Sequence, residues 1–217
     1  MIRLLSTSCV PKYKQPIVWI SWFKMKKDYY HTHFLAYHEQ TFNVNPGSFL
    51  KPLAICLKPG ARILDVGCGS GRDLLWFKNK GFAVTGFERS SGLAQLAREN
   101  VGCEIIEGDF EHFDFSIFQA DAVLSIGSLV HVAHDKMADI LGGIVRSLQI
   151  KGYLLITLKE GRGTKDLPDG RTFYLWTQES LAALFDSLNL DQVDFSRQVS
   201  KVRPDDVWIG YVLWKKS

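Results

Sequence analysis

An apolar run that ends in a turn of alternating glycines limits this chain to few folds. Residues 61–72 read A-R-I-L-D-V-G-C-G-S-G-R. The apolar run predicts a buried strand, and Gly67, Gly69 and Gly71 predict a sharp turn that a ligand can approach closely. Backbone N–H groups after such a turn attract phosphate, and the carboxylate of Asp65 opposes that charge. The segment therefore predicts a cationic ligand without phosphate.

A second acid follows at a suitable distance. A helix is expected to begin near Ser70, a good N-cap, and to end at Gly81. The strand predicted at 82–88 then ends in Glu88, which lies 17 residues after Gly71. This is close to the interval of about 20 residues at which a carboxylate in such a unit meets ribose hydroxyls. Two acids at the ends of adjacent strands suit an ammonium group and a diol.

A third element, the strand and loop at 103–110, ends in Asp109 and Phe110. The aspartate is placed to accept a hydrogen bond from an adenine amino group, and the phenylalanine to pack against the ring. Together these residues resemble the successive motifs of class I S-adenosylmethionine-dependent methyltransferases. The turn reads D-x-G-x-G-x-G, whereas dinucleotide enzymes have G-x-G-x-x-G, so a nicotinamide cofactor is disfavoured.

The resemblance covers about residues 28–217, with its specific motifs in the first half. It implies an α/β, Rossmann-like fold: a doubly wound, mostly parallel seven-stranded sheet with an antiparallel C-terminal hairpin and an N-terminal helical lid. The implied cofactor is S-adenosyl-L-methionine, with S-adenosyl-L-homocysteine as product. The cofactor-binding residues that it implies are Tyr30, Tyr37, Asp65, Gly67, Cys68, Gly69, Gly71, Glu88, Arg89, Asp109, Phe110 and Ser125.

The lid is expected in a helical stretch that begins at Asp28. Tyr30 and Tyr37 stand seven residues apart, on one face of that helix. Similar methyltransferases carry a Tyr-x-x-x-Ala-x-x-Tyr pattern over the cofactor, and Phe34 takes the alanine position here. The two tyrosines are therefore either lid residues or packing residues of an amphipathic helix. The nearby histidines lack partner ligands at suitable spacing, so no metal site is expected.

Strand and helix patterns continue to alternate through the remaining chain. This alternation predicts a parallel sheet with helices on both faces and a ligand crevice at the carboxyl ends of the strands. An exposed, mobile loop is expected at 159–171. The other predicted elements are a strand at 120–126, a helix from Met137 to Leu148, a strand at 153–158 introduced by Gly152, a helix capped by Thr177, and paired strands at 192–200 and 206–214.

Methyl transfer to a hydroxyl or a protonated amine requires a base. His131 follows the predicted strand at 120–126, and an imidazole titrates near neutrality. His131 is therefore either the catalytic base or a residue that shapes the pocket. His134 is expected to cap the next helix or to face water. The candidate acceptor-binding residues are Arg171, Tyr174 and Arg203, with Trp208 near the same hairpin.

Composition agrees with one globular enzyme domain. A chain of 217 residues with 46% apolar content buries a substantial core. We expect an ill-ordered extension at 1–24 and one domain at 25–217, with the lid at about 28–57 and the core at 58–217. The extension has no acid before Asp28, and Met25 is an alternative natural start. Its apolar run at 17–23 is too short to span a bilayer, which needs about 20 residues.

Charge and cysteine content narrow the function. The net charge of +3 is too small to argue for nucleic acid, and the four cysteines show no C-x-x-C spacing. A cytoplasmic monomer or homodimer without membrane association is expected. Three functions stay open: a small-molecule methyltransferase, which is favoured; an RNA (tRNA) nucleoside methyltransferase; and a non-catalytic cofactor-binding module on the same fold.

Overall fold

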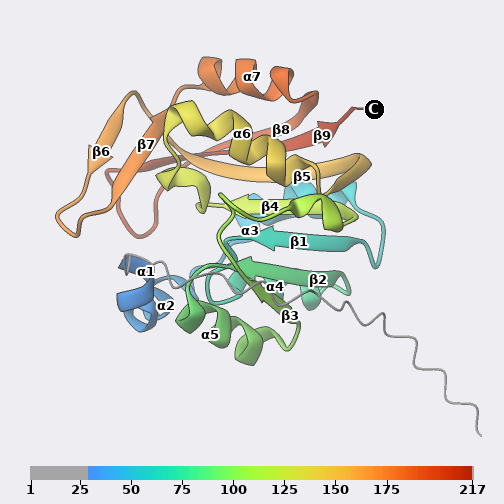
Figure 1. Cartoon of the computed structure of the whole chain (residues 1–217), viewed down its shortest axis with the longest axis horizontal. Helices are drawn as coiled ribbons and strands as arrows, with labels where there is room; N and C mark the ends of the chain where they lie inside the picture. Colours follow the sequence, from blue (N-terminus) through green and yellow to red (C-terminus); the bar gives the residue numbers. More distant parts are fainter. Residues whose placement is uncertain (1–28, 217) are drawn as a thin grey trace, which may run out of the picture.

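Parallel pairing of the predicted strands produces the sheet at the centre of the molecule (Figure 1). The computed structural model describes residues 29–216. In these residues the sheet has nine strands, not the expected seven, and its path runs β3-β2-β1-β4-β5-β7-β6. Strands β1 to β5 are parallel, and β9 pairs antiparallel with both β5 and β8. The strands are β1 Arg62–Val66, β2 Ala83–Glu88, β3 Glu104–Glu107, β4 Ala120–Ile126, β5 Leu148–Glu160, β6 Thr164–Asp166, β7 Thr172–Trp176, β8 Leu190–Val199 and β9 Val207–Lys215.

Helices cover both faces of this sheet because the buried strands carry apolar residues on both sides. On β1, Ile63 packs with α3 and α4, whereas its neighbour Leu64 packs with α6 and α7. The doubly wound α/β fold and its C-terminal hairpin are thus confirmed. The helices are α1 Tyr29–Thr32, α2 Phe34–Thr41, α3 Gly47–Cys56, α4 Arg72–Lys78, α5 Ser91–Val101, α6 His134–Val145 and α7 Gln178–Ser187, with short 3-10 turns η1 Phe115–Ile117 and η2 Leu129–His131.

Two helix starts differ from the sequence expectation. The helix after the glycine turn begins at Arg72, and its N-cap is Gly71 in a left-handed conformation, not Ser70. The Ser70 hydroxyl instead lies 2.9 Å from Nδ1 of His38. The helix expected from Asp28 is interrupted at His33, so the two lid tyrosines belong to different helices. Thr177 does cap α7, accepting a hydrogen bond from the backbone N–H of Ser180.

The expected exposed loop at 159–171 is largely wrong. The strand β5 continues to Glu160, and β6 and β7 form an antiparallel hairpin. β7 also pairs in parallel with the last two residues of β5, beyond the point where β4 ends. At its other end β5 begins at Leu148, which the helical pattern had assigned to the preceding helix. Backbone pairing with neighbouring strands decided both ends.

The expected lid segment divides into two parts. Figure 1 shows α1 and α2 at the end of the sheet toward which the parallel strands point, near the β6–β7 hairpin. In α3, by contrast, Leu50 and Leu53 are fully buried against β1, β4 and β5. Phe49, which precedes Leu50 in α3, packs against Gly210 of β9. Thus α3 belongs to the core and also reaches the crevice.

The N-terminal predictions fall outside the described residues. These are the extension at 1–24, the apolar run at 17–23 and the start of the lid at Asp28. Between residues 29 and 216, no helix has the length and apolar character that a membrane span requires.

Candidate active site

Two adjoining cavities open at the carboxyl ends of the parallel strands. The first, called here the turn cavity, has a volume of about 90 Å³ and is lined by the glycine turn, Glu88 and His131. The second, called the hairpin cavity, has a volume of about 180 Å³ and reaches from α2 and α3 to the β8–β9 link. Both cavities are lined by Tyr30, Tyr37, Ile126 and Gly127. The four shared residues mark the junction where two bound molecules would meet.

The glycine turn is required by close packing. Gly67 has a φ of +79°, and a Cβ there would lie only 2.3 Å from Cβ of Ser128. A Cβ on Gly71 would lie 2.6 Å from a methyl group of Val101 in α5. Any other residue would push the turn away from its neighbours. Ser128, which also lines the turn cavity, was not anticipated from the sequence.

Glu88 presents a buried carboxylate to the turn cavity. Its Oε2 accepts a hydrogen bond from the backbone N–H of Gly69 at 2.9 Å, and Oε1 accepts one from Ser90 at 2.8 Å. Burial raises the pKa of Glu88, and these N–H donors oppose that effect. Each oxygen keeps capacity for a further donor, which suits ligand hydroxyls.

Asp65 lies behind the turn and does not line either cavity. Its side chain points to the same sheet face as α4, is 1% exposed, and its Oδ2 has no hydrogen-bond partner within residues 29–216. Burial, together with the charge of Asp73, raises its pKa well above the usual range. A positive ligand near the turn would compensate this carboxylate, whereas a phosphate would not.

The expected adenine end is only partly assembled. Phe110 lines the turn cavity, as does Arg89. Asp109 does not; its carboxylate lies 3.5 Å from Arg89 and accepts the backbone N–H of Glu111. Its role toward an adenine amino group stays a prediction.

Three other predicted cofactor residues do not line the turn cavity, namely Gly71, Cys68 and Ser125. Ser125 is fully buried and its hydroxyl lies 2.8 Å from that of Ser128, because alternation along β4 turns it to the opposite face from Ile126. Cys68 is buried among Leu74 and the alanines of α5. Burial raises the pKa of its thiol well above the usual range, so it stays protonated.

The lid is held down by specific contacts. The rings of Tyr30 and Tyr37 meet edge to face with centroids 5.1 Å apart. The hydroxyl of Ser90, at the N-cap of α5, donates to the backbone carbonyl of Tyr30. Phe34 lies against Gly92, where a Cβ would come within 2.6 Å of its ring. The phenylalanine in the alanine position of the motif is therefore accommodated by a glycine opposite.

Tyr30 also contacts the predicted base. Nδ1 of His131 lies 2.8 Å from the carbonyl oxygen of Thr172, which can only accept, so Nδ1 carries a proton. In the neutral imidazole Nε2 is then an acceptor, and the Tyr30 hydroxyl donates to it at 2.8 Å. Arg171 hydrogen-bonds the same hydroxyl. Burial raises the pKa of Tyr30, and Arg171 opposes this.

A family model described as a methyltransferase domain matches residues 63–152. The matched segment covers less than half of the chain and is similar to the methyltransferase domains that this model describes. Among solved structures, it is similar to Burkholderia thailandensis 1,6-didemethyltoxoflavin-N1-methyltransferase, with a TM-score of 0.70 and 23% identity over 87% of this chain and 84% of that one. That structure contains 1,6-didemethyltoxoflavin and S-adenosylhomocysteine.

Two curated relatives illustrate the range of similarity. Methyltransferase GfsG of Streptomyces halstedii is 30% identical over 115 residues, or 49% of this chain and 41% of the relative. Probable tRNA methyltransferase 9B of Mus musculus is 31% identical over 100 residues, or 46% of this chain and 22% of the relative. Across the curated relatives the matched part spans between 6% and 53% of their length.

S-adenosylmethionine, the cofactor that the resemblance to these methyltransferases implies, fits the residues present. The buried carboxylate oxygen of Asp65 without a partner suits positive charge, and the carboxylate of Glu88 suits the ribose hydroxyls. Phe110 and Leu93 supply apolar surface in the turn cavity for the adenine. The turn cavity therefore contains the groups that such a cofactor would require.

Of the predicted acceptor residues, Arg171 and Arg203 line the hairpin cavity, and Tyr174 does not. Tyr174 packs edge-on against His134, whereas its neighbour Phe173 faces the cavity. Alternation along β7 explains this, since successive side chains point to opposite faces. His134 likewise neither caps α6 nor only faces water, because its Nε2 hydrogen-bonds the carbonyl oxygen of Leu175.

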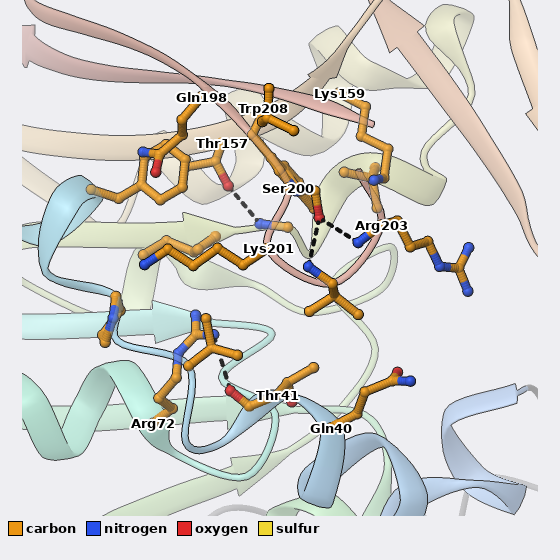
Figure 2. Close-up of a pocket in the computed structure, with 18 of the residues that line it drawn as sticks. Gln40, Thr41, Arg72, Thr157, Lys159, Gln198, Ser200, Lys201, Arg203 and Trp208 are labelled. Atoms are coloured by element: carbon orange, nitrogen blue, oxygen red, sulfur yellow. Dashed lines mark hydrogen bonds between the residues drawn. The ribbon is translucent and has the colours of Figure 1, made fainter. Parts of the chain in front are cut away.

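Lys159 is the functional candidate that the sequence analysis misplaced. It is 3% exposed and lines the hairpin cavity (Figure 2). It also forms an ion pair with Asp206. Its ammonium also lies 4.2 Å from the ring centroid of Trp208. Leu155, Thr157 and Lys159 lie on one face of β5, because alternate residues of a strand share a face. Extending the predicted strand past residue 158 would therefore have placed Lys159 on the same face as Thr157. Among the described residues, no cluster of potential metal ligands is present.

Proposed function

We propose that this protein transfers the methyl group of S-adenosylmethionine to a small-molecule acceptor. One observation carries the proposal: the turn cavity and the hairpin cavity meet at Tyr30, Tyr37, Ile126 and Gly127. A cofactor in the first cavity and an acceptor in the second would be in contact only there. The hairpin cavity, at about 180 Å³, suits a small molecule.

Alignment is the main catalytic contribution that the chain can offer. The cofactor supplies a methyl group already activated by the adjacent positive sulfur. Tyr30 and Tyr37 form an aromatic wall at the junction, which orients the acceptor and excludes water. The hydrogen-bonded pair of Tyr30 and His131 stands at this junction. Proton transfer from the acceptor to the Tyr30 oxygen, with the hydroxyl proton passing to Nε2 of His131, completes the base function.

Cofactor binding is the first test. Calorimetry with S-adenosylmethionine, S-adenosylhomocysteine and NAD should show binding of the first two and not of the third. Tight binding of NAD with neglect of the sulfur compounds would overturn the proposal. The same titration with Glu88→Gln, and with Glu160→Gln as a control outside both cavities, assigns the binding to the turn cavity.

The acceptor class is tested with methyl-labelled cofactor. The protein is incubated with a cell extract, which is then divided into RNA, protein and small-molecule fractions. We expect label in the small-molecule fraction. A His131→Gln variant should transfer little label there while binding S-adenosylhomocysteine as before. Absence of label in every fraction despite cofactor binding would favour a non-catalytic module.

RNA methylation is the second candidate, supported by the similarity to the mouse protein named as a probable tRNA methyltransferase. In that case label appears in the RNA fraction, and RNA binding falls steeply with added salt because phosphate contacts release counterions. If the RNA fraction is labelled and the small-molecule fraction is not, RNA methylation replaces small-molecule methylation as the proposed function.

A further inference from the structure

The hairpin cavity is lined by cations and by no acid. Five basic side chains reach it, and no aspartate or glutamate is among its lining residues between 29 and 216. The turn cavity next to it has the opposite character, with the carboxylate of Glu88 in its wall and that of Asp65 buried behind. The five basic residues are Arg72, Lys159, Arg171, Lys201 and Arg203.

Three of these cations surround one aromatic ring, that of Phe173 in β7. The Lys159 ammonium lies 4.6 Å from the ring centroid, the Arg171 guanidinium 5.8 Å and the Arg203 guanidinium 5.9 Å. Figure 2 shows Lys159 and Arg203 on the same side of the cavity. This group, called here the Phe173 cluster, concentrates positive charge in one corner of the cavity.

Two carboxylates offset this charge only in part. Asp206 is shared by Lys159 and by Lys165 of the β6–β7 hairpin. Asp169 binds Arg171 through both carboxylate oxygens. Four cations in and beside the cluster therefore face two carboxylates, an excess of two positive charges.

Arg203 is the member of the cluster with the weakest protein partner. Its Nη2 lies 3.8 Å from Asp169, beyond hydrogen-bond distance, and its side chain is 37% exposed. By contrast Arg171 lies 3.7 Å above the ring of Tyr29 and is 10% exposed. The Arg203 guanidinium therefore keeps its donors for a ligand, in a fork that matches a carboxylate or a phosphate.

The opposite charges of the two cavities also determine which ligand binds in each. A cationic methyl donor is favoured beside Glu88 and disfavoured beside the Phe173 cluster. Phe49 and Trp208 add flat apolar surface to the hairpin cavity. We propose that the acceptor is a small aromatic acid, whose carboxylate or phosphate binds Arg203 at the Phe173 cluster while its methyl-accepting atom faces Tyr30. This inference rests on the proposed function.

The test measures binding of four probes to the protein saturated with S-adenosylhomocysteine. The probes are 4-hydroxybenzoate, phenyl phosphate, the neutral 4-hydroxybenzamide and the cationic tyramine. We expect both anions to bind at least tenfold more tightly than the amide, and tyramine not to bind. The stronger anion identifies the acidic group. Arg203→Gln should abolish the preference for anions, and Arg203→Lys should restore part of it.

Arg197→Gln is the matched control, because Arg197 pairs with Glu160 and does not line the cavity. Its probe affinities should equal those of the wild type. Three results would overturn the inference while the methyltransferase proposal stands. The amide and the anions could bind equally, neither anion could bind, or Arg203→Gln could keep the preference for anions. Failure of S-adenosylhomocysteine itself to bind would instead remove the proposed function. Salt-sensitive RNA binding lost in Arg203→Gln, without an anion preference among the probes, would assign the cluster to RNA.

Discussion

The hydroxyl oxygen of Tyr30 lies 2.8 Å from Nε2 of His131. The two residues are 101 positions apart and come from the lid and from the turn after β4. The lid therefore supplies one of the two hydrogen-bond partners described for the imidazole, and α1 forms part of the site. The contact is compatible with both interpretations of His131, as a base and as a residue that shapes the pocket.

Removing the Tyr30 hydroxyl should lower turnover more than cofactor affinity. In Tyr30→Phe the ring still packs on Tyr37, but the proton path to His131 is lost. We expect kcat for the acceptor found in the labelled fraction to fall by about 10²-fold, as for loss of a general base. The dissociation constant of S-adenosylhomocysteine should stay within about twofold of the wild-type value.

Tyr174→Phe provides the control, since it removes the same atom from a tyrosine outside both cavities. Its kcat should match the wild type. If Tyr30→Phe also turned over at the wild-type rate, Tyr30 would have only a packing role.

Glu88→Gln should weaken cofactor binding and lower stability together. The carboxylate accepts the N–H groups of Gly69 and Ser90 with separate oxygens, and an amide has only one oxygen to offer. We expect S-adenosylhomocysteine affinity to drop roughly tenfold to hundredfold, as for a lost charge-assisted hydrogen bond. Calorimetry measures the affinity for S-adenosylhomocysteine, and thermal denaturation measures the stability of the protein. An unchanged affinity would show that Glu88 does not bind the ribose.

The contact between Phe34 and Gly92 predicts a compensating pair of substitutions. In Gly92→Ala the new methyl group would lie 2.6 Å from the Phe34 ring, so the lid must shift. Overpacking of this kind costs about 1–3 kcal/mol. Cofactor affinity should fall in Gly92→Ala and recover in the double variant Phe34→Ala/Gly92→Ala, which restores the alanine of the family motif. Independent, additive effects of the two substitutions would contradict this lid geometry.

Asp206→Asn should destabilise the protein because it leaves the buried ammonium of Lys159 without its counter-charge. The side chains of Lys159 and Asp206 are 4% and 3% exposed. Breaking a buried pair by removing one partner costs about 3–5 kcal/mol. Asp191→Asn, which removes a surface pair with Lys216, should cost at most about 1 kcal/mol.

The same substitution predicts a pH dependence. Burial acts to raise the pKa of Asp206, but the hydrogen bonds from Lys159 and Lys165 prevail and hold it below its ordinary value. A lowered carboxyl pKa gives stability that is complete above the unfolded value near pH 4 and is lost as pH falls through the folded value. Denaturation curves of wild type and Asp206→Asn should therefore converge below about pH 4. If the difference in unfolding free energy stayed constant across the acid range, the loss of stability in Asp206→Asn would not come from the charge of Asp206.

The donor side of the site could be predicted from sequence because its residues are close along the chain. Asp65, the glycines and Glu88 lie within one βαβ unit, where a strand, a turn and a helix fix their relative positions. Phe110 follows the next strand of the same sheet. Local backbone geometry and strand order were enough to bring these residues to one edge.

Alternation along strands accounts for several of the misplaced residues. Ser125 and Tyr174 were predicted to lie in the site, but neither lines either cavity. Lys159 was assigned to the loop expected at 159–171, yet its ammonium is buried against Asp206 and two aromatic rings. A charged residue in a strand cannot be placed until its partner is known.

The sequence by itself determined the α/β fold, the glycine turn and the positions of Asp65 and Glu88 at adjacent strand ends, since these depend on periodicity and on steric rules within short segments. Only the tertiary structure decided which residues line the hairpin cavity. Tyr30 with His131, and Arg203 with Phe173, come from elements far apart in the chain. Contacts of that kind arise from packing and charge pairing between elements, and no local pattern specifies them.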